Sequence, residues 1–300
     1  MELRHLRYFV AVAEEGSLTL AAERRLHTAQ PSLSRQIRDL EYQVGVPLMT
    51  RGARGIELTD AGKVFLDHAR LVLAQVEAAG EAARRTAHPA RPSFALGFLT
   101  GHEMEWLPEA MRILRGEMPN IEITITSRYS PDLADALTRG KLDVAFLRPE
   151  RQSPDLVFQL LAKEPLMFVL PAGHRLASRD AVSLHDIVDE TFISVSGTAP
   201  SLRAIIHDFL QRSGVDIVPD HEADNISMAI SLVASTRGVA LLPIYVRHFL
   251  PSTVVSRPVK EDSPTIDLVL GYHRANTSPL LKFFLSRVDD LIVRVAGNPH

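Results

Sequence analysis

The chain has 300 residues, a formal net charge of −3 at pH 7 and no cysteine. This length exceeds one comfortable core and predicts more than one domain, and the absence of cysteine excludes disulfides and thiolate metal sites. No apolar run approaches the ~20 residues that cross a bilayer, and the apolar stretch at residues 8–13 is too short for a signal peptide. We therefore expect a cytoplasmic protein with no membrane partner.

Two short helices are predicted at the N-terminus. Apolar residues at spacings of three and four indicate a first helix that ends near Gly16, and they are Leu3, Leu6, Phe9, Val10 and Ala13. Ser17 is a suitable N-cap for a second helix over residues 18–25. Ala21 and Ala22 are small enough for this helix to contact the first closely.

A third helix is predicted over residues 28–44, with Thr28 as its N-cap and Pro31 in its first turn. One face is an apolar stripe, formed by Leu33, Ile37, Leu40 and Val44. The opposite face carries side chains that read nucleic acid, because arginine binds guanine edges or phosphate, glutamine binds adenine and serine binds either. We assign to DNA binding Gln30, Pro31, Ser32, Ser34, Arg35 and Arg38. The second and third helices are joined by a short turn, and the third carries this polar face. The pair predicts a helix-turn-helix that binds double-stranded DNA.

A β-wing is predicted directly after the third helix. Short apolar segments at 47–49 and 56–58 flank a glycine-rich tip that holds Arg51 and Arg54. Arginines on such a tip enter a narrow minor groove or bind phosphate. Residues 1–59 thus form a predicted winged helix-turn-helix. The alternative for its third helix is an ordinary surface helix with a solvated basic face, and the balanced charge of residues 1–60 does not decide between the two.

These motifs carry a family resemblance. The segments M-E-L-R-H-L-R-Y-F-V-A-V-A, A-A, L-H-T-A-Q-P-S-L-S-R-Q-I-R-D-L-E and L-T-D-A-G, together with the arginine wing, resemble the LysR-type transcriptional regulators. One departure is visible: three residues, Glu23, Arg24 and Arg25, lie between the second alanine and the next leucine, where the family usually has two. The extra residue falls at the end of the second helix or in the turn.

A long linker helix is predicted over residues 60–88, capped by Thr59. Small and apolar residues recur along it at heptad spacing, at Phe65, Ala69, Val72, Val76, Ala79 and Ala83. This seam predicts a coiled coil between two chains. The protein would then be a homodimer whose two DNA-binding domains have a fixed spacing. The alternative is a helix packed on its own domain. Prolines then break the helix, and residues 89–92 are interpreted as a hinge.

Strands alternate with helices after residue 93, which favours α/β domains with largely parallel sheets. The predicted strands are 94–99, 121–126, 144–147, 166–171, 192–195, 239–243 and 266–271. The predicted helices are 105–118, 131–139, 202–213, 226–235 and 280–295. Sheets of this kind bind ligands beyond the C-terminal ends of their strands, close to helix N-termini.

Three strand ends carry chemistry that suits a small organic anion. Thr100, Gly101 and His102 follow the first strand, Ser130 follows the second, and a hydroxyl-rich run occupies residues 194–201. Backbone N–H groups and hydroxyls at helix starts bind anions, and Arg148 adds a fork for a carboxylate. The alternatives are helix caps for the hydroxyls and a surface ion pair for Arg148, with His102 as a rim or capping residue rather than a catalyst.

The resemblance implies a periplasmic-binding-protein-like effector domain with an inducer between two α/β lobes. Lobe I would comprise 93–162 and 267–300, and lobe II 163–266. The first lobe would contribute Thr100, Gly101, Ser130, Phe146 and Arg148, and the second Ser196, Thr198, Pro200, Ser201, Asn225 and Ile226. The C-terminal motifs look like the branch regulating aromatic-acid catabolism. The family is usually tetrameric, so a homotetramer is expected, with RNA polymerase considered as a further partner of an activator or repressor.

No catalytic constellation is found in the sequence. His102 and Glu103 begin an H-E-x-x-H-like pattern, but Trp106 occupies the position of the second histidine, so a zinc site is not formed. We expect no enzyme, no metal and no cofactor. An enzyme fused to a DNA-binding head and a transport-type binding protein are the alternatives. A transport-type binding protein would need a signal peptide, and its function would not require a DNA-binding domain.

Overall fold

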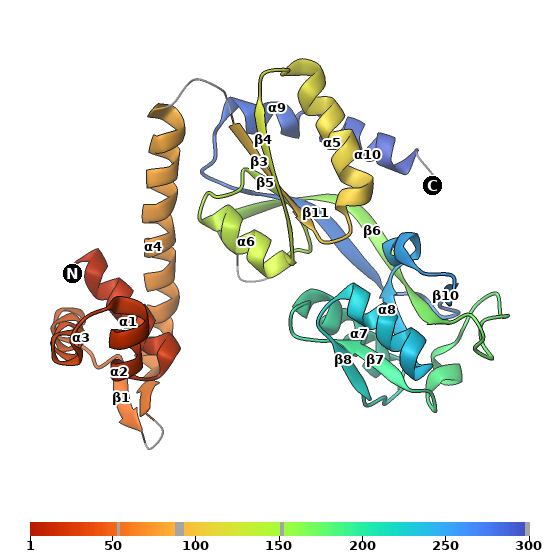
Figure 1. Cartoon of the computed structure of the whole chain (residues 1–300), viewed down its shortest axis with the longest axis horizontal. Helices are drawn as coiled ribbons and strands as arrows, with labels where there is room; N and C mark the ends of the chain where they lie inside the picture. The colour runs from red at the N-terminus through yellow and green to blue at the C-terminus, as the bar shows by residue number, and fades with distance from the viewer. Residues whose placement is uncertain (53–54, 88–92, 151–152, 298–300) are drawn as a thin grey trace. The chain divides into compact units, whose positions relative to one another are not determined.

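The computed structural model describes residues 1–52, 55–87, 93–150 and 153–297 (Figure 1). The chain divides into two compact units, Met1–Thr86 and Ala87–His300. Each is built around its own buried core. No helix in the described ranges combines the length and apolar character needed to cross a membrane.

The first two helices start and stop largely where expected. Helix α1 (Leu3–Glu15) ends at Gly16, whose φ of 62° is the left-handed conformation that glycine adopts readily. Ser17 caps α2 (Leu18–Leu20), its hydroxyl accepting a hydrogen bond from Leu20 N at 3.3 Å. The helix then widens into a π-helix, η1 (Ala21–Leu26), instead of continuing as an α-helix to Arg25. A π turn accommodates one extra residue per turn, so it absorbs the additional residue among positions 23–25.

The third helix, α3 (Gln30–Val44), begins later than predicted. Its N-cap is Ala29, so the prediction of Thr28 as the cap is wrong. The amide N–H of Thr28 instead donates to Ala22 O at 3.1 Å and closes the π-helix. The apolar stripe is confirmed at Leu33 and Leu40, which are fully buried in the core of this unit.

The wing and the linker helix follow. Strands β1 (Met49–Gly52) and β2 (Gly55–Leu58) pair antiparallel, which confirms the predicted hairpin. Helix α4 (Asp60–Ala87) starts as predicted, because the Thr59 hydroxyl accepts from Gly62 N at 2.9 Å and donates to Pro47 O at 2.9 Å. The base of α4 is also tied to α1, since Glu14 accepts hydrogen bonds from Arg25 and from Arg70.

The heptad positions of α4 fall into two groups, one packed in the core of its own unit and one exposed. Phe65 packs edge-on against Phe9 with ring centroids 5.1 Å apart, and Ala69 is buried in the same core. The interpretation of these two residues as part of an intermolecular coiled coil is therefore wrong. Farther along, Val72 and Val76 are 44% and 38% exposed, and Ala79 and Ala83 are also exposed. Only this second part of the seam is available to another chain.

Gly62 gives a direct test of how the linker helix meets the wing. A β-carbon there would lie 1.9 Å from the carbonyl oxygen of Leu48. Alanine is normally about 1 kcal/mol better than glycine inside a helix. We expect Gly62→Ala to reverse that sign and to lower the free energy of unfolding by about 1–3 kcal/mol, as overpacking does.

Urea unfolding of the full-length variants measures this difference. The matched control is Gly116→Ala in α5 (Glu103–Glu117), where a β-carbon meets nothing within 4 Å. The control should be neutral or slightly stabilising. Equal stability of the two alanine variants would show that the wing does not press on Gly62.

The second unit is one continuous sheet with helices on its faces. Its strand order is β4-β3-β5-β11-β6-β9-β7-β8, with β10 paired to β6. The strands are β3 (Ser93–Leu99), β4 (Glu122–Arg128), β5 (Val144–Leu147), β6 (Leu156–Pro171), β7 (Phe192–Val195), β8 (His221–Ala223), β9 (Val239–Pro243), β10 (Val254–Pro258) and β11 (Thr265–His273). The remaining helices are α6 (Ser130–Thr138), α7 (Pro200–Arg212), α8 (Ile226–Thr236), α9 (Pro279–Leu285) and α10 (Val288–Ala296), with 3-10 helices η2 (Leu184–Ile187) and η3 (Ile244–Phe249).

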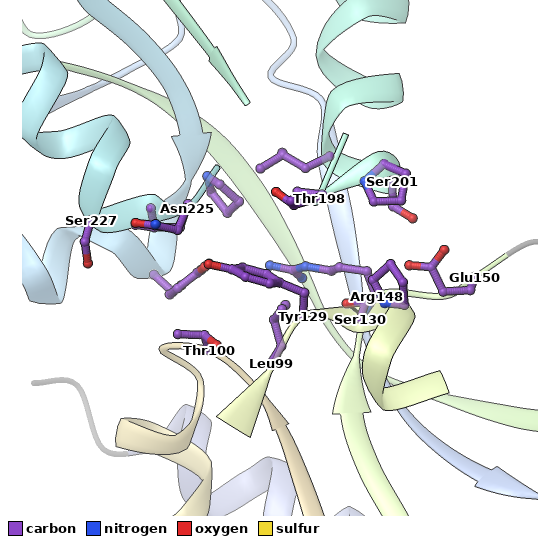
Figure 2. Close-up of a pocket in the computed structure, with 17 residues that line it drawn as sticks. Leu99, Thr100, Tyr129, Ser130, Arg148, Glu150, Thr198, Ser201, Asn225 and Ser227 are labelled. Atoms are coloured by element: carbon purple, nitrogen blue, oxygen red, sulfur yellow. Dashed lines mark hydrogen bonds between the residues drawn. The ribbon is translucent and has the colours of Figure 1, made fainter. Parts of the chain in front are cut away.

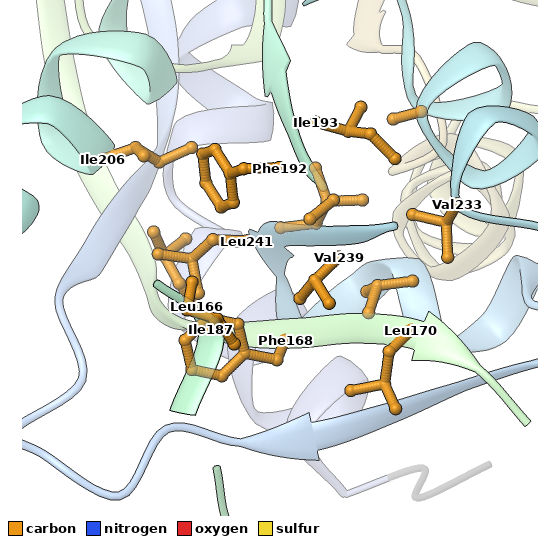
Figure 3. Packing of buried hydrophobic residues seen from close by; sticks show 14 of the residues in the cluster. Leu166, Phe168, Leu170, Ile187, Phe192, Ile193, Ile206, Val233, Val239 and Leu241 are labelled. Atoms are coloured by element: carbon orange, nitrogen blue, oxygen red, sulfur yellow. The ribbon is translucent and has the colours of Figure 1, made fainter. Parts of the chain in front are cut away.

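Two long strands join two lobes. β6 and β11 pair antiparallel, and each contributes to both cores: Leu161 and Leu268 lie in the first, Leu166 and Ile266 in the second. Figure 3 shows the second core, where side chains of β6, β7 and β9 pack against Ile206 of α7 and Val233 of α8. The two-lobed α/β architecture expected from the sequence is confirmed.

Some elements differ from the prediction. The expectation of largely parallel sheets is wrong at the middle of the sheet, where β11 runs antiparallel to β5 and β6, and β6 runs antiparallel to β9. β6 begins at Leu156 rather than at residue 166, because its first half pairs with β11, from Leu156 opposite His273 to Pro165 opposite Thr265. The expected helix over residues 280–295 is two helices, since Ser286 N bonds to Lys282 O and Phe283 O and ends the first of them.

Candidate functional site

Helix α3 presents a polar face to solvent. Leu33, Ile37 and Leu40 point into the core, which leaves the other side of α3 free. Pro31, Ser32, Arg35 and Arg38 are exposed, and Gln30 and Ser34 are half-buried. Within the described part of the chain the two arginines make weak contacts: Arg35 Nε lies 3.9 Å from Asp39 Oδ2, and Arg38 Nε lies 3.4 Å from Ser34 O. Both guanidinium groups are thus available to an external partner.

The wing arginines are only partly described. Arg51 lies on β1, opposite Ile56 in the ladder. Arg54 lies outside the described residues. Their assignment to DNA binding remains a prediction.

Arg38 is the clearest test of the polar face of α3. If its guanidinium contacts a base, Arg38→Ala should weaken binding to specific DNA by about 1–3 kcal/mol, which is a factor of about 5 to 150. Fluorescence anisotropy measures this on duplexes that the wild-type protein selects from a random library. Arg115→Ala, an exposed arginine of α5, is the charge-matched control and should leave affinity unchanged. Wild-type affinity of the Arg38 variant would remove this residue from the interface.

A pocket lies at the strand ends of the second unit, between the two lobes. Its volume is about 170 Å³. The first lobe lines it with Leu99, Thr100, Tyr129, Ser130, Pro131, Arg148 and Glu150, and the second with Thr198, Ala199, Pro200, Ser201, Leu202, Asn225, Ile226, Ser227, Pro243 and Tyr245. α6, α7 and α8 all start at this pocket, as the side chains labelled in Figure 2 show. Helix N-termini with hydroxyl groups are suited to an anion.

The structure brings together most of the residues that the sequence placed in this site. Those on the pocket wall are Thr100, Ser130, Arg148, Thr198, Pro200, Ser201, Asn225 and Ile226. Four others, Gly101, His102, Phe146 and Ser196, are absent from the wall as described. Ser196 supports the wall instead, because its hydroxyl lies 3.0 Å from the Thr198 hydroxyl.

The other three residues lie behind the wall. Phe146 is fully buried, stacked on Phe98 with ring centroids 4.6 Å apart. Gly101 has a φ of 99°, and a β-carbon there would lie 2.8 Å from the Tyr245 ring, so glycine permits the close approach. His102 is 1% exposed, so the expectation of a rim residue is wrong; it occupies the N-cap position of α5, although its side chain makes no capping hydrogen bond.

Arg148 is fixed in place by three neighbours. Its backbone N–H donates to the Ser130 hydroxyl at 2.9 Å, and its Nη2 donates to Glu164 Oε2 at 2.5 Å. Its guanidinium carbon lies 5.9 Å from the centre of the Tyr245 ring. The second terminal nitrogen, Nη1, is buried and has no hydrogen-bond partner among the described residues. Arg148 therefore lies on the pocket wall with one charged, desolvated nitrogen left without a partner among the described residues.

Glu164 and His102 form the layer behind Arg148. His102 Nε2 lies 3.0 Å from Glu164 Oε1, and the His102 ring is 4.0 Å from that of Tyr245. Complete burial lowers the pKa of His102, so the ring is neutral at pH 7, with Nε2–H assigned as the donor to Glu164. Burial alone would raise the pKa of Glu164, but hydrogen bonds from His102 and the charge of Arg148 hold it below its ordinary value. The carboxylate stays ionised and pairs with Arg148.

Three of the residues that sequence reasoning missed at this site bear on its chemistry. Glu164 lies in the first half of β6, where no strand was expected. Tyr245 follows Pro243 in η3, and only its position after the buried strand β9 could have indicated it. Glu150 lies two residues beyond Arg148, and the same strand-end rule that found Arg148 could have included it.

The class of protein follows from these two features. An exposed recognition helix in a winged unit, and a two-lobed α/β unit with an anion-type pocket, define a ligand-responsive DNA-binding regulator. Comparison with known families agrees: residues 3–63 match the bacterial regulatory helix-turn-helix protein, lysR family, and residues 87–291 match the LysR substrate binding domain. The chain belongs to the LysR family of transcriptional regulators, which are not enzymes.

Individual relatives cover the whole chain. The Hca operon transcriptional activator HcaR of Escherichia coli K12 is 36% identical over 298 residues, 99% of this chain and 100% of that protein. The regulator AlsR of Bacillus subtilis 168 is 34% identical, covering 95% and 94%. The crystal structure of full-length BenM is 27% identical with a TM-score of 0.61, covering 100% of this chain and 99% of that one.

Proposed function

We propose that this LysR-type regulator binds promoter DNA as an oligomer and is switched by a small aromatic or related carboxylate in the pocket between its lobes. Arg148 carries the proposal. Its Nη1 is buried without a partner, and leaving a charged donor unsatisfied costs free energy that a bound carboxylate would recover.

Size and polarity favour an aromatic ring next to that carboxylate. The pocket volume is about 170 Å³. Engineered apolar cavities of about 150 Å³ hold benzene. Leu99, Leu202, Ile226 and Pro243 give the pocket apolar walls, while the hydroxyls of Thr100 and Ser201 stand at its edge. A single ring with an acidic group fits this combination, which is also in keeping with the sequence resemblance to regulators of aromatic-acid catabolism.

Promoter binding is proposed for the face of α3 and the wing arginines. The exposed second part of the α4 seam, from Val72 to Ala83, supports a homodimer through this helix. A homotetramer through the effector units and contact with RNA polymerase extend the proposal. The proposed boundaries are 1–59 for the DNA-binding domain, 60–88 for the linker and 89–92 for the hinge, which lies outside the described residues. Lobe I is 93–162 with 267–300, and lobe II is 163–266.

The switch is proposed to be a shift between lobe arrangements. A ligand moves such an equilibrium only if it binds one arrangement more tightly. The pocket has walls from both lobes, so a ligand that contacts Arg148 on one side and Asn225 on the other favours the closed arrangement. Glu164 lies on the crossing strand β6 and holds Arg148, so the anion site is connected to a strand shared by both lobes.

The test is a binding screen on the full-length protein. Benzoate, 3-phenylpropanoate and aliphatic carboxylates of similar size are titrated by isothermal calorimetry, with the matching amides as controls. We expect at least one aromatic acid to bind and its amide to bind much more weakly. Binding by none of the acids, or equal binding of acid and amide, would contradict the proposal.

A further inference from the structure

A second unsatisfied polar group faces the same pocket. Glu150 lies on its wall, and its Oε1 is buried without a hydrogen-bond partner among the described residues. Figure 2 shows its carboxyl group beside Ser201 at one end of the pocket-lining side chains, whereas the Arg148 side chain extends away from that end. The pocket therefore holds an unpaired donor and an unpaired acceptor at different places.

Neighbouring donors do not serve Glu150. The Ser201 hydroxyl is directed to Pro149 O at 3.2 Å, and Arg148 Nη2 is bound to Glu164. Burial raises the pKa of Glu150, as expected for a carboxyl group removed from water without a compensating contact. A buried oxygen without a donor costs free energy, and a ligand that donates a hydrogen bond to it would offset that cost.

A second carboxylate on the ligand is disfavoured at this end. Two carboxylates at hydrogen-bond distance repel each other, and one of them must take up a proton. Arg148 does not neutralise Glu150, because the ion pair that Arg148 makes is with Glu164. Of the common substituents of a small acid, a hydroxyl or an amino group supplies a donor without added negative charge.

We infer that the effector is a carboxylate that also carries a hydrogen-bond donor, a hydroxyl or amino group, which binds Glu150 while the carboxylate binds Arg148. This inference rests on the proposed function, because it assumes an acid in this pocket. It goes further in naming a second contact and in assigning Glu150 the role of selecting among acids of similar size.

Calorimetry on the full-length protein tests the selection. The probes are benzoate and 3-phenylpropanoate, each with its three ring-hydroxylated isomers and its three ring-amino isomers. We expect at least one hydroxy or amino isomer to bind roughly tenfold or more tightly than its parent, the gain of a hydrogen bond to a charged group. The two series distinguish a hydroxyl from an amino group.

Variants at Glu150 show whether that preference has the proposed origin. Glu150→Leu keeps the size but removes the acceptor, and it should bring the preference for the isomer down to about onefold while the parent acid still binds. Glu150→Gln keeps an oxygen acceptor without the charge and should retain a reduced preference, which also guards against misfolding of the leucine variant. Glu122→Gln, at an exposed carboxylate of β4 that does not line the pocket, is the control and should keep the wild-type ratio.

The outcomes separate the two proposals. If the parent acids bind but no isomer binds more tightly, or if Glu150→Leu keeps the full preference, the inference is wrong and the proposed function stands. If neither parents nor isomers bind the wild type, the proposed function fails and the inference fails with it.

Discussion

Glu164→Gln is expected to lower the free energy of unfolding by about 3–5 kcal/mol, the usual result of leaving a buried charge unpaired. Arg148 is 5% exposed, and its Nη2 bonds to Glu164 Oε2 at 2.5 Å, so a neutral amide at position 164 would leave the guanidinium buried without its counter-ion. The loss therefore comes mainly from the orphaned Arg148, and only in part from the missing hydrogen bond.

The same pair predicts how stability depends on pH. The pKa of Glu164 is held below its ordinary value of 4.5 in the folded protein. A carboxyl group of this kind contributes stability that is fully present above the unfolded pKa and is lost as the pH falls below it. Since the folded pKa of Glu164 is about 2, the wild type should lose its advantage over Glu164→Gln progressively from about pH 5 down to about pH 2. Urea unfolding of both proteins across this range measures the difference, and a constant difference would contradict an ionised Glu164.

The double variant Arg148→Gln with Glu164→Gln is expected to fold and yet lose effector binding. Neither buried charge remains, so its stability should lie closer to wild type than that of either single variant. Without the guanidinium, the anion loses its charged partner, which costs about 2–5 kcal/mol of binding free energy. Calorimetry with the tightest-binding carboxylate of the screen measures the loss.

A matched control separates this effect from the removal of charge alone. Arg212 and Asp208 on α7 form an ion pair of 3.0 Å whose side chains are 66% and 63% exposed. Exposed pairs contribute about 0–1 kcal/mol. Arg212→Gln with Asp208→Asn should leave both stability and effector binding almost unchanged. Wild-type affinity of the variant at positions 148 and 164 would place the acid elsewhere in the protein.

Local signals made much of this fold predictable. β5, β7 and β9 are short, fully buried apolar runs between turns, and their bounds match the expected ones. Ser17 and Thr59 cap their helices because a hydroxyl reaches a free N–H within the same turn. Arg148 directly follows the buried strand β5, and Ser130 begins α6 two residues after the mostly exposed strand β4, so both lie at strand ends as expected.

The features that the sequence did not predict involve contacts between distant parts of the chain. Glu164 belongs to a crossing strand whose polar residues are explained only by Arg148 and His102, which lie in other parts of the sequence. Phe65 and Ala69 have the spacing of a heptad seam and also pack in the core of their own unit. Spacing alone does not distinguish contact with a second chain from contact within the unit. The extra residue among positions 23–25 was visible, but its accommodation as a π-helix depends on packing against α1 and α3.

The most direct test of the account is a DNase footprint of the full-length protein on a duplex that it selects, with and without the tightest-binding carboxylate. We predict a footprint of two half-sites on one face of the duplex, whose length or internal cleavage pattern changes when the acid is added. The variant with glutamine at positions 148 and 164 should give the acid-free footprint under both conditions. A footprint that the acid leaves unchanged in the wild type, or changes equally in that variant, would contradict control of DNA binding through this pocket.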